Sequence, residues 1–513
     1  MKRAPLAIAI AALLTFAFTG GGRITGSDEI AQLNFARSFP WRIDIPPEGS
    51  TLQGHDGRFY TKNTAGQAIL ALPLVKAGAL AARVAGFQGA RAELASRFIP
   101  SFFNGIVGAL LLAAAYTVMR SFRLSSRASL MATIGLGFTT PTWITAKGFA
   151  AEPIEALGML LALGGGARAG AAPSPEDQRR GERWAGVGAF LAIFVKLGVA
   201  PMVLACLAAI GRRRPRAWLL PLTGIVASFG THAIYNWMRF RNAFESGYGS
   251  QQSFEAFSTP LRVGAYGLLF SSGKGVAWFA PMMWLAPLGF AAMLGAWKQP
   301  GVPPRGEDTR HAAWAIALAW AAGICIYGRF EHWGGDGSWG PRYLAPLLPL
   351  GAVAVAFALD GASKWVRWSW RVLAPVGLLV TLGGVGIYFG AEMREVGDYP
   401  YKLPLSDPRF MHASHWEWHQ SPILVSWKML SRNVGEHVRG RAPEIGKQTD
   451  VDPRTGISNE ESGVLTHAID LWWLYAGYAG LPKVPLGIAA ILLLVAAVFA
   501  WRRAWHAVCE DTA

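Results

Sequence analysis

The sequence opens on Met1-Lys2-Arg3 and the apolar segment Ala4–Thr19, and after a glycine-rich turn it continues as Gly26-Ser27-Asp28-Glu29-Ile30. A basic end before an apolar run is typical of a signal peptide or of a first membrane helix. No clear Ala-x-Ala cleavage site follows the run, so we predict an uncleaved helix. Asp28 and Glu29 then lie a few residues beyond a membrane span, within reach of both water and the bilayer surface.

The composition indicates the class of protein. Of the 513 residues, 52% are hydrophobic and only 16% are charged, and the mean hydropathy is +0.28, whereas soluble domains carry about a quarter charged residues. Apolar runs recur along the whole chain, which predicts an all-α polytopic membrane protein. The net charge of +16 does not indicate a nucleic-acid partner, because Lys and Arg fall in short clusters between the apolar runs, as in cytoplasmic loops.

These basic clusters set the predicted topology. If all of them are cytoplasmic, an even number of spans separates any two. This rule makes Gly66–Phe87 an interfacial juxtamembrane helix in the first outer loop rather than a span. It also divides Trp184–Ile210 into two short crossings, with Lys196 at the outer turn. The clusters are Lys2-Arg3, Arg120/Arg123/Arg127, Arg168/Arg179/Arg180/Arg183, Arg212/Arg213/Arg214/Arg216, Lys298/Arg305/Arg310, Lys364/Arg367/Arg371 and Arg502-Arg503.

The resulting chain crosses the cytoplasmic (inner) membrane about twelve times and has both termini in the cytoplasm. We divide it into a transmembrane region (1–390), an extracytoplasmic loop region (391–482) and a last transmembrane helix with a cytoplasmic tail (483–513). The other predicted spans are Phe98–Met119, Ala128–Thr145, Pro153–Leu163 onward, Ala217–Trp237, Gly275–Trp297, Ala312–Tyr327, Tyr343–Leu359, Val372–Phe389 and Val484–Trp501.

Ionisable residues gather in the predicted outer loops, at the ends of helices. Transporters tend to place such residues near the bilayer midplane on broken helices, whereas mid-span charges are few here. The distribution therefore favours chemistry at the membrane surface over transport. The outer-loop residues include Asp28, Glu29, Asp56, Lys62, Glu152, Glu155, Lys196, Arg239, Glu245, Tyr248, Lys274, Arg329, Glu331, Asp336 and Arg342.

Several short motifs follow one another along these loops. Ser27-Asp28-Glu29 follows the first helix, and Tyr60-Thr61-Lys62 lies further along the same loop. Glu152-Pro153 closes the second outer loop, and Val195-Lys196-Leu197-Gly198 forms the turn between two short helices. The last motif, His332–Tyr343, ends in Gly-Pro-Arg-Tyr after a Trp-Gly-Gly sequence.

Over roughly Met1–Leu359, these motifs resemble the GT-C superfamily of integral-membrane glycosyltransferases. The superfamily includes the protein O-mannosyltransferases and the bacterial transferase that adds aminoarabinose to lipid A. The chain departs from the family pattern at two places, because Asn63-Thr64 replaces a Pro-Pro pair and Glu152 stands where many members have Asp.

The resemblance implies an inverting transfer of a sugar from a polyprenyl-phosphate donor to a lipid, glycan or protein acceptor at the outer face of the membrane. Asp28 would be the base that takes the proton of the acceptor hydroxyl, with Glu152 assisting. From the sequence signal alone, Ser27 or Asp28 is also an ordinary helix N-cap. The residues expected to bind substrate, with the cations on the phosphate, are Glu29, Tyr60, Lys62, Lys196, Tyr248, Asp336, Arg342 and Tyr343.

The motifs require no cofactor. Glu152 would either help to bind a divalent cation or orient a basic residue, or it would simply open a helix, where a negative charge is favoured. The run His412-Ala413-Ser414-His415-Trp416-Glu417-Trp418-His419 fits no well-defined zinc site.

Two other functions stay open. A transporter or flippase of lipid-linked saccharides predicts flux without new glycosidic bonds. A non-catalytic scaffold that binds partners through 391–482 predicts that Asp28 and Arg342 are dispensable.

Overall fold

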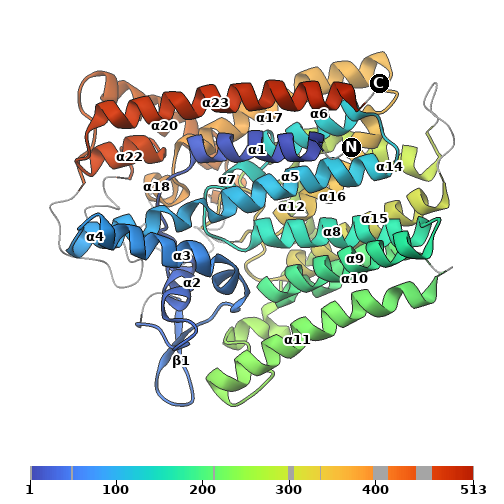
Figure 1. Ribbon diagram of the computed structural model, residues 1–513, viewed down its shortest axis with the longest axis horizontal. Coiled ribbons are helices and arrows are strands. Elements are labelled where there is room, and N and C mark those ends of the chain that lie inside the picture. Colours follow the sequence, from blue (N-terminus) through green and yellow to red (C-terminus); the bar gives the residue numbers. More distant parts are fainter. Residues whose placement is uncertain are drawn as a thin grey trace.

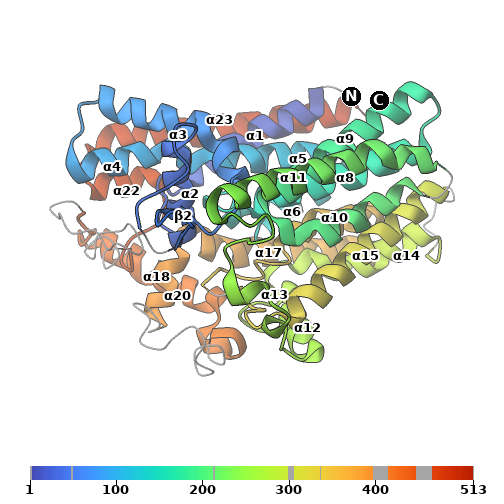
Figure 2. The same cartoon turned by 90° about the horizontal axis from the view of Figure 1, so that it is seen from below.

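A computed structural model describes residues 3–47, 50–211, 214–297, 306–335, 337–396, 414–445 and 465–511. The chain forms a bundle of long helices that run horizontally in Figure 1, with α2, α4 and the strands toward the left of that view. Both termini lie toward the other end of the bundle (Figures 1 and 2). The two termini thus share one end, as the predicted topology requires, and the membrane side of that end stays a prediction.

The described chain is mainly helical. Its helices are α1 (Arg3–Thr19), α2 (Ser27–Ser38), α3 (Gly66–Val84), α4 (Gly89–Phe98), α5 (Phe103–Ser121), α6 (Ser126–Phe138), α7 (Thr142–Thr145), α8 (Glu152–Ala171), α9 (Pro175–Val195), α10 (Ala200–Leu207), α11 (Leu219–Phe240), α12 (Leu261–Phe270), α13 (Val276–Phe279), α14 (Ala286–Leu294), α15 (Glu307–Arg329), α16 (Leu348–Leu359), α17 (Lys364–Gly386), α18 (Phe389–Glu395), α20 (Pro422–Val438), α22 (Trp472–Tyr478) and α23 (Lys483–Glu510).

One short hairpin corrects the all-α prediction. Strands β1 (Thr51–Gln53) and β2 (Phe59–Thr61) pair antiparallel, with Thr51 opposite Thr61. Gly57 has a φ of +77° in the connecting turn, a conformation that glycine adopts without steric cost. The aromatic and β-branched residues of β2 favour a strand. The hairpin lies inside the first predicted outer loop.

The polytopic helical class is confirmed. Within the described residues, six helical segments are long and apolar enough to cross a membrane, and shorter apolar helices accompany them. The count of about twelve crossings stays a prediction. The six segments are Gly66–Val84, Arg91–Ser121, Pro215–Phe240, Glu307–Arg329, Lys364–Gly386 and Lys483–Glu510.

Helix α3 is the segment that the sequence assigned to the membrane surface, although its length and composition would allow it to span. It packs on α2 and α4, and a Cβ atom at Gly78 would lie only 2.3 Å from the Ser96 carbonyl oxygen. Helix α3 also contacts α9 at its first residue, Gly66, which lies against the Phe194 carbonyl. The interfacial placement of α3 stays a prediction.

Helices α8 and α9 form an antiparallel pair joined by a tight turn. Ser174 caps α9 by accepting a hydrogen bond from the Asp177 amide. Small residues face each other along the pair: Cβ atoms at Gly158 and Gly188 would each approach the backbone of the opposite helix to less than 3 Å. α9 ends at Val195, and α10 begins at Ala200, so the predicted division of Trp184–Ile210 at Lys196 is confirmed.

Two predicted spans are broken, which corrects the sequence analysis. Gly275–Trp297 contains α13, a 3-10 turn that begins at Pro281, and α14 rather than one helix. Ala128–Thr145 is divided into α6 and α7, with Pro141 between them. Proline lacks an amide hydrogen and collides with the preceding turn, so the α-helix ends before each of these prolines. The predicted outer loop Arg239–Lys274 also contains a helix, α12.

The described C-terminal part packs on the first helix. α23 runs beside α1 (Figures 1 and 2). The Trp472 amide donates to the Gly20 carbonyl over 2.8 Å, and the Trp472 and Trp473 indoles donate to the Ala17 and Phe18 carbonyls. These bonds satisfy carbonyl groups that the end of α1 leaves without helical partners. Residues 397–413 and 446–464 of the predicted loop region 391–482 lie outside the described residues.

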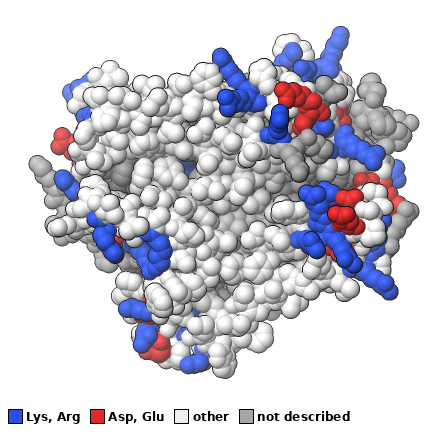
Figure 3. All heavy atoms as spheres, in the orientation of Figure 1, with Lys and Arg blue, Asp and Glu red and all other residues white. Residues whose placement is uncertain are grey.

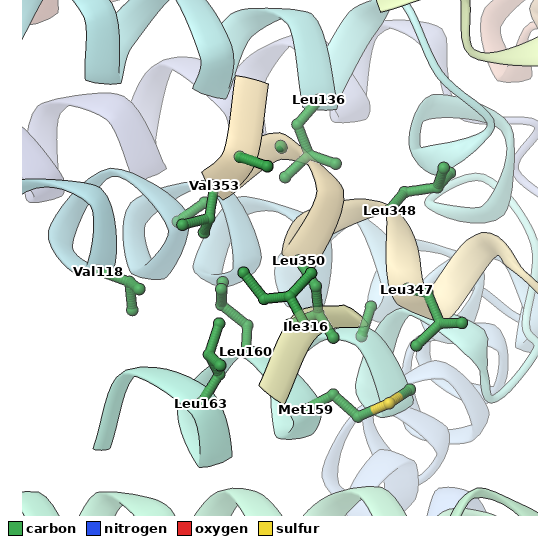
Figure 4. Packing of buried hydrophobic residues seen from close by; sticks show 14 of the residues in the cluster. Val118, Leu136, Met159, Leu160, Leu163, Ile316, Leu347, Leu348, Leu350 and Val353 are labelled. Carbon is green, nitrogen blue, oxygen red and sulfur yellow. The ribbon is translucent and has the colours of Figure 1, made fainter. Parts of the chain in front are cut away.

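The core and the surface have the segregation expected of a membrane bundle. Leucine, valine, isoleucine and methionine side chains from α5, α6, α8, α15 and α16 interdigitate in its interior (Figure 4). On the face shown in Figure 3, charged side chains gather toward the two ends of the helices, and a broad middle region carries few of them. An uncharged band of this kind suits contact with lipid.

Candidate active site

Asp28 lies in the first turn of α2. The Glu29 carboxylate accepts hydrogen bonds from the Gly26 amide over 3.2 Å and from the Phe149 amide over 2.7 Å. Glu29 therefore caps α2 and ties it to the loop before α8. Glu29 was expected to bind substrate, and its contacts are those of a structural residue. With Glu29 turned inward, Asp28 is left free to face the neighbouring loops.

The β-hairpin brings Lys62 to Asp28. Their Nζ and Oδ1 atoms are 3.3 Å apart, and 33% and 34% of the two side chains are exposed. Arg239, buried at the end of α11, supports β2 by donating to the Thr61 carbonyl over 2.6 Å. The Tyr60 hydroxyl donates to Asp56 over 2.8 Å. Tyr60, expected to bind substrate, instead stabilises the hairpin that presents Lys62.

Helix α8 contributes two carboxylates at its first turn. Glu152 and Glu155 are three residues apart and therefore share one helix face, and their side chains are 3% and 1% exposed. Arg342 Nε lies 2.5 Å from Glu152 Oε1, and Lys196 Nζ lies 3.7 Å from Glu155 Oε1. Glu155 was not among the predicted site residues, although its spacing from Glu152 was a usable signal.

Lys196 sits where α9 breaks, with φ −158° and ψ 112°. Its ammonium group lies 5.3 Å from the centre of the Tyr343 ring and 5.9 Å from that of Tyr327. These two rings stack in parallel at 4.3 Å. The aromatic pair provides a cation–π surface for the partly exposed Lys196 side chain. Tyr343 thus lies at the site as expected, and Tyr327 from α15 was missed because only the tertiary fold brings it there.

The loop before α16 positions Arg342. Gly335 and Gly340 have φ values of +74° and +70°, and a Cβ atom at Gly340 would lie 2.6 Å from the Phe279 ring. Pro341 follows, and its carbonyl accepts bonds from the Leu344 and Ala345 amides. The glycines therefore allow the sharp turns that aim Arg342 at α8. Asp336, also predicted at the site, lies outside the described residues.

Tyr248 is the last of the predicted substrate-binding residues that the structure describes. Its hydroxyl donates to Asn63 Oδ1 over 3.2 Å, next to Lys62. Burial and the nearby Asp28 carboxylate raise the pKa of the Tyr248 hydroxyl, so it stays protonated and able to donate a hydrogen bond. The structure thus brings Asp28, Lys62, Glu152, Glu155, Lys196, Tyr248, Tyr327, Arg342 and Tyr343 to one end of the bundle.

The charges of this cluster control Asp28. Burial raises the pKa of the Asp28 carboxyl, but Lys62 and Arg342 outweigh this effect and hold that pKa below its ordinary value of 3.8. Asp28 is therefore ionised at neutral pH. In the described part of the chain, Glu152 Oε2 and Glu155 Oε2 are buried without a hydrogen-bond or ion-pair partner, whereas Asp28 Oδ1 and Glu155 Oε1 each face a lysine ammonium group. Carboxylates with unused acceptor positions beside clustered cations are an arrangement suited to a polar, anionic ligand.

No metal site emerges from the described residues. They contain no group of three His, Cys, Asp or Glu side chains arranged to hold an ion. Glu152 is engaged by Arg342 instead, which matches the predicted alternative that it orients a basic residue. In the histidine-rich run, His415 packs edge-on against Trp333, and His419 pairs with Glu417. His412 lies outside the described residues.

Comparison with known proteins adds a distant likeness. No family model and no curated protein match the chain. Two crystal structures of ArnT from Cupriavidus metallidurans, a GT-C glycosyltransferase, are similar. The apo state aligns with TM-score 0.45 and 11% identity over 87% of this chain and 81% of that chain. The undecaprenyl phosphate complex aligns with TM-score 0.45 and 13% identity over 98% of this chain and 74% of that chain. Likeness at this level transfers no residue role.

Proposed function

We propose that this protein is an inverting glycosyltransferase of the GT-C type, which moves a sugar from a polyprenyl-phosphate donor to an acceptor at the outer face of the cytoplasmic membrane. The observation that carries the proposal is the meeting of one partly exposed carboxylate, Asp28, with Lys62, Arg342 and Lys196 at one end of the helix bundle. The first and the last of these residues, Asp28 and Arg342, are more than three hundred positions apart in the sequence.

In the proposed reaction, Asp28 accepts the proton of the acceptor hydroxyl as that oxygen attacks the anomeric carbon. The bond from this carbon to the phosphate oxygen breaks at the same time, and the configuration of the sugar inverts. Because the lipid phosphate is a good leaving group, the protein needs no nucleophile of its own. Lys62, Lys196 and Arg342 neutralise the charge that develops on the phosphate.

The ion pairs suggest how the donor activates the base. Without the donor, Lys62 neutralises Asp28, which weakens that carboxylate as a base. A phosphate group competes for Lys62 and Arg342, and it brings additional negative charge close to Asp28. Both effects raise the pKa of Asp28 towards the range in which it accepts a proton more readily. The base is therefore strengthened when the leaving group is in place.

The alternatives fit less well. A flippase or transporter needs ionisable groups along its path through the membrane, whereas these carboxylates and cations lie at helix ends. A scaffold has no need for buried carboxylate oxygens without hydrogen-bond partners, which are costly to maintain. The identity of the sugar and the acceptor is left to experiment.

The direct test is transfer by the purified protein. The wild type and Asp28→Asn would be incubated with a panel of polyprenyl-phosphate sugars and acceptors, and new glycosidic products would be detected by mass spectrometry. We expect product from the wild type and about 1,000-fold slower transfer by the folded variant. Saccharide flux across vesicles without product would support transport instead. Equal transfer by the two proteins would remove Asp28 from the mechanism.

A further inference from the structure

A second charge cluster, formed by Arg23, Lys147 and Asp470, is nearly closed to water. Arg23 Nη1 lies 2.5 Å from Asp470 Oδ1, and Lys147 Nζ lies 3.2 Å from Asp470 Oδ2. The exposed fractions of the three side chains are 4%, 5% and 11% for Arg23, Lys147 and Asp470. One carboxylate from the C-terminal segment therefore holds two cations from distant parts of the chain.

The positions of these cations connect them to the candidate site. Arg23 precedes Asp28 by five residues, and Lys147 precedes Glu152 by five residues. Both cations thus lie at the start of the short segments that carry the two carboxylates. Asp470 belongs to a third part of the chain and pairs with both cations. Its amide donates to the Gly386 carbonyl at the end of α17 over 2.8 Å.

Other bonds fix the same junction. Lys147 Nζ also donates to the carbonyls of Asp470 and Val385. The Arg23 guanidinium lies over the rings of Tyr388 and Tyr475, with 4.7 Å and 5.1 Å to their centres. Glycine allows the close approach, because a Cβ atom at Gly21 would lie 2.8 Å from Asp470 Oδ1.

We propose that Asp470 is a positioning residue for sugar transfer, which sets the separation of Asp28 and Glu152 by clamping Arg23 and Lys147 together. This inference rests on the proposed function. The Glu29 carboxylate, bonded to the Phe149 amide over 2.7 Å, is a second tie between the same two segments. With both ties in place, neither carboxylate can move independently of the other. Positioning of this kind strongly affects rate, because misplacement of reacting groups by about 1 Å can cost roughly 100-fold.

The clamp predicts a particular kinetic signature. Asp470 touches none of the cations proposed to bind the donor phosphate, so its loss acts through geometry. We expect Asp470→Asn to lower kcat on the order of 10- to 100-fold, with a smaller change in the KM for the donor. Asp470→Glu keeps the charge and should recover part of kcat. Arg432→Gln is a matched control, because it removes a 2.9 Å ion pair with Glu395 and a 2.7 Å hydrogen bond to the Thr466 carbonyl, and neither partner lies in the segments that carry Asp28 and Glu152.

A variant that leaves two buried cations unpaired is at risk of misfolding. Lys147→Met avoids this outcome, because it retains the Arg23–Asp470 pair and releases only the segment before Glu152. We expect a partial loss of kcat, and if Asp470→Asn does not fold, this variant decides the question. A kcat within twofold of the wild type in folded Asp470→Asn or Lys147→Met, or an equal loss in Arg432→Gln, would overturn the proposal.

A second readout needs no transfer assay. Amide hydrogen exchange of the full-length protein in detergent reports how firmly the two segments are held. Asp470→Asn, or Lys147→Met in its place, should increase exchange in peptides covering residues 23–29 and 147–152, whereas Arg432→Gln should not. Unchanged exchange would refute the clamp itself. If the wild type transfers no sugar but the variants still show increased exchange in these peptides, the proposed function is refuted and the clamp remains supported.

Discussion

The two charge clusters of this protein use the same kinds of side chain in different ways. Around Asp470, both carboxylate oxygens contact a cation, and all three side chains are nearly sealed from solvent. Around Asp28, a third of the side chain is exposed, and one carboxylate oxygen each of Glu152 and Glu155 has no hydrogen-bond or ion-pair partner in the described chain. The sealed cluster around Asp470 is suited to holding structure, and the partly exposed cluster around Asp28 is suited to receiving a ligand.

The strongest test of this contrast is Asp28→Asn. We expect transfer to fall about 1,000-fold, within the range that a positioned general base supplies. The unfolding temperature should change little, because partly exposed ion pairs contribute about 0–1 kcal/mol. Initial rates and thermal unfolding of the same preparation would measure both effects. Asp44→Asn in the same outer loop is a control, because the ion pairs of Asp44 are with Arg42 and Arg58, outside the cluster.

Arg342→Gln tests the shortest of the three ion pairs described around Asp28, the 2.5 Å pair with Glu152. We expect a loss of transfer on the order of 100-fold. Stability should fall by about 3–5 kcal/mol, because the Glu152 carboxylate stays buried without its cation. The double variant Glu152→Gln/Arg342→Gln should recover stability but not transfer. Recovery of both, by rates and thermal unfolding, would show that the pair is only structural.

Lys62→Met should have a smaller effect that is confined to the donor. We expect the donor KM to rise roughly tenfold, which corresponds to about 1.4 kcal/mol of phosphate binding. Lys62→Arg should retain most of the affinity, because it keeps the charge. Steady-state kinetics at varied donor concentration would show the difference. A normal KM in Lys62→Met would place the phosphate elsewhere.

The ion pairs around Asp470 should affect how the stability of the protein depends on pH. Burial raises the pKa of the Asp470 carboxyl, but Arg23 and Lys147 outweigh it, so the pKa lies below its ordinary 3.8. A carboxyl with a lowered pKa contributes stability that is present above the ordinary value and is lost as the pH falls through the lowered one. Asp470→Asn should therefore reduce the unfolding temperature at pH 7, and the difference from the wild type should shrink below about pH 4.

Much of the architecture follows from local sequence signals. Apolar runs and basic clusters are sufficient to predict a helical membrane protein. The rule that an even number of spans separates two cytoplasmic clusters also predicted the break at Lys196 that the structure contains. The predicted element boundaries were wrong where a single proline or glycine changes the backbone conformation. Pro281 divides a predicted span, and the residues on either side of Gly57 form a hairpin rather than a plain loop. Hydropathy averages over a window and does not register such single residues.

The candidate site was partly visible in the sequence. Asp28, Lys62, Glu152, Lys196 and Arg342 were selected from the motif resemblance and from their predicted common side of the membrane, and the structure brings them together. Glu29 is adjacent to Asp28 in the sequence, and Tyr60 lies two residues before Lys62, but both side chains make hydrogen bonds within the protein. Adjacent positions on a helix face different directions, so the place of Glu29 beside Asp28 did not decide which of the two side chains reaches the site.

The sequence by itself determined the membrane class, because burial of apolar side chains in a bilayer depends on composition over about twenty neighbouring residues. It also determined that charges collect at helix ends, since a charge within the hydrocarbon is costly. Only the tertiary structure decided that Asp470 pairs with Arg23 and Lys147. Ion pairs between segments hundreds of residues apart depend on how the helices pack, and no local pattern in the chain specifies that packing.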